Sequence, residues 1–161
     1  MSDQARITNQ KDGSTFAHAP GDSVLRAALR ASVGLSYECN SGGCGGCKFE
    51  LIEGEIENLW PEAPGLTERD KRRGRHLACQ CAPRGDITIS APSAAEYVPK
   101  QPPRRQAARL TSVRDITHDI REFRFVATSG ADFLPGQFAM LDLPGVTGSR
   151  AYSLANTPNA E

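Results

Sequence analysis

The sequence lacks any long apolar run, and its N-terminus does not place basic residues ahead of an apolar stretch. We therefore expect neither a membrane-spanning helix nor a secretory signal. It also lacks an excess of one charge, since 19 basic residues balance 19 acidic ones, and this gives no reason to expect a nucleic-acid partner. The 161 residues are enough for one ordinary domain or two small ones.

Histidine is scarce as well. The three histidines, His18, His76 and His118, do not lie at the spacings at which histidine joins cysteine in zinc sites. Zinc sites usually show two short cysteine pairs or a mixture of Cys and His, so a zinc site is disfavoured. Disulfides are less favoured still, because three of the five cysteines crowd one glycine-rich loop and the odd count would leave a thiol over.

The cysteines that are present carry the most specific pattern in the chain. Four of them read C-x4-C-x2-C followed by a single distant cysteine, which is the ligand spacing of a plant-type 2Fe-2S cluster. The pattern predicts a one-electron carrier. Because thiolate ligands require reduced cysteines, it also predicts a cytoplasmic location. The four ligand candidates are Cys39, Cys44, Cys47 and Cys79.

Glycines fill the gaps between the first three of these cysteines. Without a Cβ, a glycine can adopt positive φ and bring its amide close to a cluster sulfur, where the N–H offsets the charge of the thiolate. The glycines in question are Gly42, Gly43, Gly45 and Gly46.

The fifth cysteine, Cys81, leaves the identity of the distant ligand open on spacing alone. A strand is expected over 76–81, and side chains two residues apart on a strand share a face, so either Cys79 or Cys81 can complete the set. The cysteine that does not bind is expected to be a small buried hydrophobe.

Residues 1–92 predict one compact α+β unit. Asp22 is expected to cap a helix that runs to Ser32, and Thr67 to cap a second helix with Asp70 completing a capping box. Mixed strands around one main helix, with the cysteine loop on the outside, predict a β-grasp ferredoxin domain. The expected strands cover 5–9, 14–18, 48–53, 76–81 and 86–90.

Residues 93–105 are rich in proline and poor in apolar side chains, which predicts a semi-rigid linker. Beyond it, residues 106–161 show no helical pattern, so this unit is expected to begin as an antiparallel β-barrel or sandwich. Its expected strands cover 107–113, 120–127 and 137–143.

A second candidate site lies in the segment 150–156. Arg150 can present a guanidinium to a phosphate, Tyr152 an aromatic face to a flat ring, and Ser153 a hydroxyl to a ring nitrogen. The pattern R-x-Y-S is short enough to occur by chance, and a plain edge strand is the alternative. Its position after a cluster domain and a proline linker favours flavin binding, because a flavin is the cofactor that would work together with an iron-sulfur cluster in electron transfer.

Three stretches of the chain, residues 37–47, 58–61 and 77–81, closely resemble the reductase components of bacterial multicomponent oxygenases. The nearest likeness is to the NADH reductases of soluble di-iron toluene and alkene monooxygenases, and it covers essentially the whole chain. The resemblance implies a ferredoxin domain, then an FAD barrel, then a nicotinamide domain. It also implies that Cys79 rather than Cys81 joins the other three cysteines on the cluster, and that FAD is contacted by Arg150, Tyr152 and Ser153.

The sequence departs from that family by stopping at Glu161 and by containing no G-x-G-x-x-G nucleotide loop. We therefore expect this chain to be a fragment of a longer reductase, and we assign the NADH dependence to that full-length parent protein. The ferredoxin unit is expected to bind its cluster, and the incomplete barrel to lose FAD on purification. The resemblance implies an oxygenase component or its Rieske-type ferredoxin as the electron acceptor. A Rieske dioxygenase reductase and a stand-alone ferredoxin are the alternatives.

Two aromatic residues near the cysteine loop, Tyr37 and Trp60, have two interpretations. They can form an exit for electrons, or they can pack under the loop as ordinary hydrophobic side chains. Packing is the more common role of an aromatic residue beside a loop, so it is the favoured interpretation.

Overall fold

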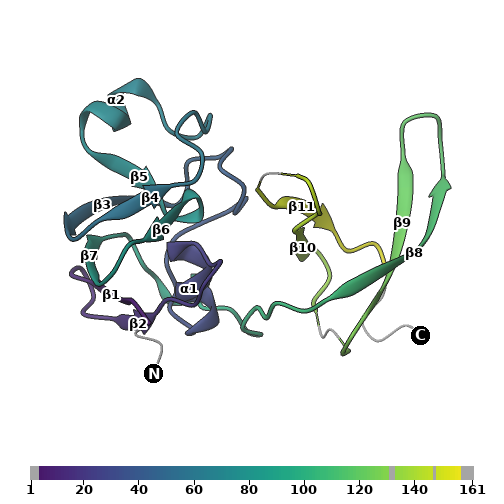
Figure 1. Ribbon diagram of the computed structural model, residues 1–161, viewed down its shortest axis with the longest axis horizontal. Coiled ribbons are helices and arrows are strands. Elements are labelled where there is room, and N and C mark those ends of the chain that lie inside the picture. Colours follow the sequence, from purple (N-terminus) through teal and green to yellow (C-terminus); the bar gives the residue numbers. More distant parts are fainter. Residues whose placement is uncertain (1–3, 131–132, 147, 157–161) are drawn as a thin grey trace. The chain divides into compact units, whose positions relative to one another are not determined.

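The computed structural model describes residues 4–130, 133–146 and 148–156 (Figure 1). Its helices are short and its strands are numerous, as expected for an α+β protein. Within the described ranges, no helix combines the length and the apolar character needed to cross a membrane.

The chain divides into two compact units. The first contains the residues up to Pro103 together with the strand pair between Phe138 and Tyr152. The second contains Arg104–Gln137 and the residues from Ser153 onward. The cysteine loop belongs to the first unit, which also holds nearly all of the buried apolar side chains.

The first unit is built on a five-stranded sheet with the order β2-β1-β7-β3-β5. Neighbouring strands are antiparallel, except that β1 and β7 run parallel. The expected opening hairpin and the strands over 48–53 and 86–90 are confirmed. The strands of this sheet are β1 (Arg6–Asn9), β2 (Thr15–Ala17), β3 (Lys48–Glu53), β5 (Arg75–Leu77) and β7 (Ile87–Ser90).

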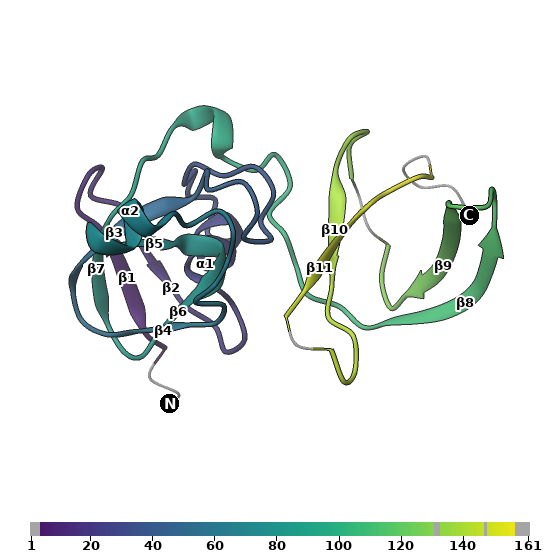
Figure 2. The same cartoon turned by 90° about the horizontal axis from the view of Figure 1, so that it is seen from above.

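One main helix, α1 (Val24–Arg30), buries its apolar face in the same core as Ile7, Phe49 and Ile89 of the sheet. The helix lies beside β2 and β6 (Figure 2). Each of these three sheet side chains is at most 2% exposed. Because burying a side chain of this size contributes about 1.5–3 kcal/mol, this core is the main source of the unit's stability.

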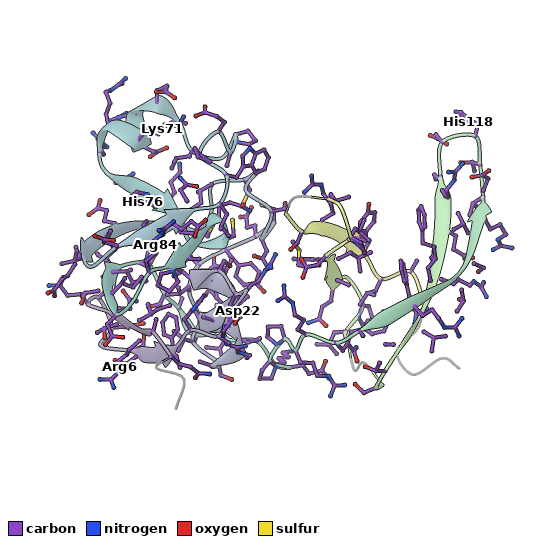
Figure 3. The ribbon with its side chains drawn as sticks, viewed as in Figure 1. Arg6, Asp22, Lys71, His76, Arg84 and His118 are labelled. Carbon is purple, nitrogen blue, oxygen red and sulfur yellow. The ribbon has the colours of Figure 1, made fainter. Side chains whose placement is uncertain are left out.

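The start of α1 differs from the prediction that Asp22 caps it. Ser23 is the N-cap, and its Oγ accepts a hydrogen bond from the Arg26 amide at 3.3 Å. Asp22 lies one residue too early for its carboxylate to reach that amide, and it pairs instead with the Arg30 guanidinium at 2.6 Å (Figure 3). The helix also ends before Ser32, which has a φ of 58°.

The predicted strand over 76–81 is wrong, and the difference bears on the cysteines. The chain leaves β5 at Leu77, makes the 3-10 turn η1 (Ala78–Gln80), and enters β6 (Cys81–Pro83). β6 pairs with β4 (Ile56–Asn58) in a separate two-stranded sheet. The strand breaks because the chain must pass from one sheet to the other, so Cys79 and Cys81 do not share a strand face.

The segment that follows β7 is fastened beside the start of the cysteine loop. The Ala94 amide donates to the Gly34 carbonyl and the Ser36 amide to the Pro92 carbonyl, each at 2.9 Å. A Cβ at Gly34 would collide with the Ala94 carbonyl oxygen, so this close approach requires glycine. The short helix η2 (Ala95–Tyr97) follows this contact.

Two further antiparallel strand pairs complete the described part of the chain. β8 (Ala108–Asp115) pairs with β9 (Arg121–Ala127), and β10 (Phe138–Leu141) with β11 (Arg150–Ser153). The mixed five-stranded unit followed by antiparallel strand pairs agrees with the predicted fold class of a ferredoxin domain followed by an incomplete antiparallel barrel, and no closed barrel forms within the described ranges. Large apolar side chains on the β8–β9 pair are accordingly exposed, among them Leu110, Val113, Phe123 and Val126.

Candidate metal centre

The cysteine loop lies between α1 and β3 and is shaped by three residues with positive φ. Gly42 and Gly45 have φ values of 85° and 75°, and Asn40 has a φ of 51°. Glycine adopts this conformation without steric cost, and asparagine tolerates it better than most residues do. Gly43 and Gly46 keep φ outside this region, so only two of the four loop glycines use the freedom that the sequence offers.

These turns aim backbone amides at the cysteine sulfurs. The Ser41 and Cys44 amides both donate to Cys39 Sγ at 3.4 Å, and the Gly46 amide donates to Cys44 Sγ at 3.3 Å. A backbone N–H that points at sulfur stabilises the thiolate, which is the form that binds iron. The loop is therefore arranged to hold negatively charged sulfur at Cys39 and Cys44.

The electrostatics of Cys39 follow from these contacts. Partial burial favours the neutral thiol, but the hydrogen bonds from Ser41 and Cys44 outweigh that effect and lower the pKa of Cys39 to about 6. At neutral pH this side chain is therefore mainly a thiolate. Cys44 is exposed at the tip of the loop, and Cys39 is half-buried.

The other two ligand candidates are buried and touch each other. Cys47 Sγ lies 3.3 Å from Cys79 Sγ, although the two residues are separated by 32 positions in the sequence. The hydrogen bond shared with Cys79 lowers the pKa of Cys47, and the same bond together with burial raises the pKa of Cys79. The pair therefore loses its first proton easily and its second with difficulty, unless a positive ion lies beside both sulfurs.

Cys81 has the properties of a core residue. Its side chain is fully buried, and burial raises the pKa of its thiol to about 12. It starts β6 opposite Asn58 of β4 and belongs to the main hydrophobic core. The pKa of Cys79 is raised too, by its hydrogen bond with Cys47 and by burial, but it is Cys79 Sγ that lies 3.3 Å from Cys47 Sγ, so the geometry favours Cys79 over Cys81 as the distant ligand.

The sequence did not indicate that the segment before α2 (Glu68–Arg72) supports the cysteine loop. The Gly65 amide donates to the Gly42 carbonyl at 2.9 Å. A Cβ on Gly65 would lie 2.6 Å from the Gly45 nitrogen and 2.7 Å from the Gly42 oxygen, so the two backbones touch directly. The dipeptide Pro64-Gly65 signals a turn but does not reveal what the turn contacts.

Trp60 covers the other side of Gly42. A Cβ at Gly42 would lie 3.1 Å from Trp60 Cε3, so the indole packs against the loop backbone while 43% of the residue stays exposed. The Trp60 amide donates to Asn58 Oδ1 at 3.1 Å, which holds the turn after β4. Tyr37 instead contacts the ring of Tyr97, with centroids 6.2 Å apart. Both positions agree with the packing interpretation.

The donor set fits a cluster better than a single ion. Among the described residues, no group of three or more His, Cys, Asp or Glu side chains is drawn together tightly enough to hold one metal ion. A 2Fe-2S cluster makes a different demand, because it spreads four thiolates over two irons. The four cysteines match this requirement, because two of their sulfurs touch each other and the other two receive amide hydrogen bonds.

Residues 7–84, which include all five cysteines, match a family model described as a 2Fe-2S iron-sulfur cluster binding domain. The match supports a 2Fe-2S cluster binding domain over this segment. The matched range begins in β1 and ends just after β6, so it includes both the cysteine loop and the turn that carries Cys79.

The whole chain is similar to reductase components of oxygenase systems. It is 46% identical to the ferredoxin–NAD(P)+ reductase CarAd of Metapseudomonas resinovorans, over 98% of this chain and 48% of that protein. It is also 46% identical to the ferredoxin–NAD+ reductase component of the alkene monooxygenase system of Xanthobacter autotrophicus, over 92% of this chain and 45% of that protein. These relatives confirm the resemblance drawn from the motifs.

A solved structure supports the same relationship. The ferredoxin reductase in carbazole 1,9a-dioxygenase superposes with a TM-score of 0.90 at 41% identity, over 97% of this chain and 47% of that one. The chain thus spans about half the length of the relatives it matches.

In the cluster binding domain, α2 (Glu68–Arg72) is tied to the strand that leaves the cysteine loop. The predicted capping box is confirmed, because Thr67 Oγ1 accepts from the Asp70 amide and Asp70 Oδ2 accepts from the Thr67 amide, each at 3.2 Å. Asp70 also pairs with Lys48 at 2.9 Å and with Arg75 at 3.4 Å. Lys71 of α2 (Figure 3) pairs with Glu62 at 3.1 Å, which links the helix to the supporting segment.

We expect Asp70→Asn to lower the stability of the domain at neutral pH, but not in acid. Hydrogen bonds from Thr67 and Lys48 hold the pKa of Asp70 well below its ordinary 3.8. A carboxylate with a lowered folded-state pKa contributes stability above its unfolded pKa and loses it as the pH falls below that value. In thermal unfolding, the gap between wild type and variant should therefore narrow below about pH 4.

The neighbouring exposed acid Glu68 offers a matched control for that measurement. It lies on the same helix and forms an exposed ion pair with Lys71 at 3.0 Å, and pairs of this kind contribute little. Glu68→Gln should unfold close to the wild type at every pH. A gap between wild type and Asp70→Asn that stayed constant from neutral to acid pH would contradict the role given to the Asp70 carboxylate.

The candidate flavin residues lie outside the cluster binding domain, on β11. Arg150 and Tyr152 are two positions apart and so point to one side of the strand, whereas Ser153 points to the other. All three are exposed, and 46% of Tyr152 is accessible. β11 pairs with β10, so the motif sits on a regular strand as predicted.

Proposed function

We propose that Cys39, Cys44, Cys47 and Cys79 bind one 2Fe-2S cluster, and that this domain passes electrons one at a time. The observation that carries the proposal is the arrangement of the sulfurs. Amides aimed at Cys39 and Cys44 favour thiolates there, and the 3.3 Å contact between Cys47 and Cys79 suits two ligands of the same iron. When bound, the cluster supplies a site that takes up and gives away single electrons.

We infer that the full-length protein is the reductase component of a multicomponent oxygenase of the toluene or alkene monooxygenase type. In that protein NADH would supply electrons to FAD, and the cluster would hand them on singly. Arg150, Tyr152 and Ser153 would contact the FAD, since they lie exposed on one regular strand. The 46% identity to an alkene monooxygenase reductase component supports this assignment.

A dioxygenase reductase is the second candidate. It is favoured by the ferredoxin reductase in carbazole 1,9a-dioxygenase, which shares 41% identity with this chain at a TM-score of 0.90. In either case the partner would be an oxygenase component or its Rieske-type ferredoxin, and thiolate ligands would need a reducing, cytoplasmic setting. We propose that residues 1–92 form the ferredoxin domain, 93–105 a linker, and 106–161 the start of the FAD barrel.

The cluster is tested by anaerobic reconstitution of this chain, followed by iron and labile-sulfide assays and by EPR after reduction with dithionite. We expect two irons and two sulfides per chain and an EPR signal in the reduced state only, as a 2Fe-2S centre requires. Absence of stoichiometric iron and sulfide, or a reduced sample without an EPR signal, would overturn the proposal.

The flavin part is tested separately. We expect the 161-residue chain to hold its cluster but not to retain FAD, because its barrel strands leave apolar side chains exposed and no closed site forms among the described residues. A stoichiometric flavin on this chain would contradict that expectation. On the longer parent protein, bound flavin and NADH-dependent reduction of cytochrome c would separate a reductase from a stand-alone ferredoxin.

A further inference from the structure

Cys79 is the ligand candidate that reaches the centre from outside the cysteine loop, and its sulfur receives two hydrogen bonds from the protein. One is the 3.3 Å contact with Cys47 Sγ, and the other comes from the side-chain amide of Gln80, with Nε2 3.7 Å from Sγ. Gln80 follows Cys79 directly in the turn η1.

The backbone of Gln80 is held in place by β4. The Leu59 amide donates to the Gln80 carbonyl at 2.8 Å, which extends the ladder in which Asn58 faces Cys81. The direction in which the Gln80 side chain leaves the backbone is therefore set by two strands. A residue in an isolated turn would lack this constraint.

The side chain of Gln80 is also held, by the loop itself. A Cβ at Gly42 would lie 3.2 Å from Gln80 Cγ and 3.1 Å from Trp60 Cε3, so the glutamine stem and the indole both pack on this one glycine. Gln80 is half-buried as a result. The amide is thus positioned against the Cys79 sulfur before any electron arrives, and it needs little reorganisation when charge appears there.

We propose that Gln80 raises the reduction potential of the cluster through its hydrogen bond to Cys79. The inference rests on the proposed function, since it requires the cluster to be bound by Cys79. Reduction adds one electron and one negative charge to the cluster, and no bond breaks. Part of that charge is carried by the ligand sulfurs, so an N–H aimed at Cys79 stabilises the reduced form more than the oxidised form.

The test replaces Gln80 by methionine, which has nearly the same length and shape but no N–H donor. The full chain is reconstituted anaerobically, its iron and sulfide are counted, and its EPR signal is followed during titration with dithionite. We expect Gln80→Met to keep its cluster and to favour the oxidised form by about threefold to tenfold, where tenfold corresponds to about 59 mV for one electron. Gln10→Met, at an exposed glutamine just after β1, is the matched control and should titrate like the wild type.

A second variant, Gln80→Glu, keeps the length of the side chain and converts the donor into a carboxylate. It should shift the potential in the same direction as Gln80→Met and further, because it removes the N–H and adds a negative charge beside Cys79. Potentials equal to the wild type in either cluster-containing variant would overturn the proposal. Loss of iron and sulfide from both variants would overturn it too, because Gln80 would then be needed for assembly. A wild-type chain without a cluster would instead refute the proposed function.

Discussion

Cys79→Ala should abolish the cluster, whereas Cys81→Ala should retain it. Alanine has no atom that can bind iron. Changing a group that only hydrogen-bonds to a metal ligand already lowers metal affinity by about 10–100-fold, so removing a ligand itself should lower it by more than about 100-fold. All three of Cys47, Cys79 and Cys81 lie in the core, but it is Cys79 whose Sγ touches Cys47 Sγ, at 3.3 Å. Iron, labile sulfide and visible absorption after anaerobic reconstitution give the comparison.

The variants Cys79→Ala and Cys81→Ala make a stringent comparison, because the two cysteines are two residues apart and both are buried. Cys81→Ala deletes one methyl-sized group from the core, which should lower the free energy of unfolding by about 0.5–1.5 kcal/mol. Its spectrum should stay that of the wild type. If Cys81→Ala lost the cluster and Cys79→Ala kept it, the ligand assignment would be reversed.

Gly65→Ala should loosen the cysteine loop although residue 65 is not a ligand candidate. Its new Cβ would lie 2.6 Å and 2.7 Å from backbone atoms of Gly45 and Gly42, and backbone cannot swing aside as a flexible side chain can. The two segments must separate, which breaks the 2.9 Å bond from the Gly65 amide to the Gly42 carbonyl. Overpacking and the lost hydrogen bond together should cost about 2–4 kcal/mol.

Two measurements check this prediction: the urea midpoint of the cluster-loaded protein and the rate at which a chelator removes its iron. Gly43→Ala is the matched control, because a Cβ there meets nothing within 4 Å and its φ is not positive. The control should stay within about 0.5 kcal/mol of the wild type. Equal rates of iron release from Gly65→Ala and Gly43→Ala would show that the segment around Gly65 does not hold the loop.

Local features of this fold could be predicted because neighbouring residues decide them. The capping box of Thr67 and Asp70 needs only residues three positions apart, and the opening hairpin needs only a turn between two alternating runs. The choice of helix cap shows the limit of such local reasoning. Asp22 and Ser23 are both good caps by residue type, but Ser23 is the N-cap and Asp22 pairs with Arg30, eight residues away.

The chemistry of the centre was determined by the sequence alone, because the spacing of four cysteines and the glycines between them is a local pattern with one dominant use. Spacing alone left the distant ligand open between Cys79 and Cys81, and the tertiary structure places Cys79 against Cys47, because the chain changes sheets at residues 78–80 and no periodicity signals that break. Only the tertiary structure, likewise, revealed Gly65 and Gln80 as supports of the loop. Their contacts join segments that approach each other through folding, and the spacing of residues along a chain carries no record of that approach.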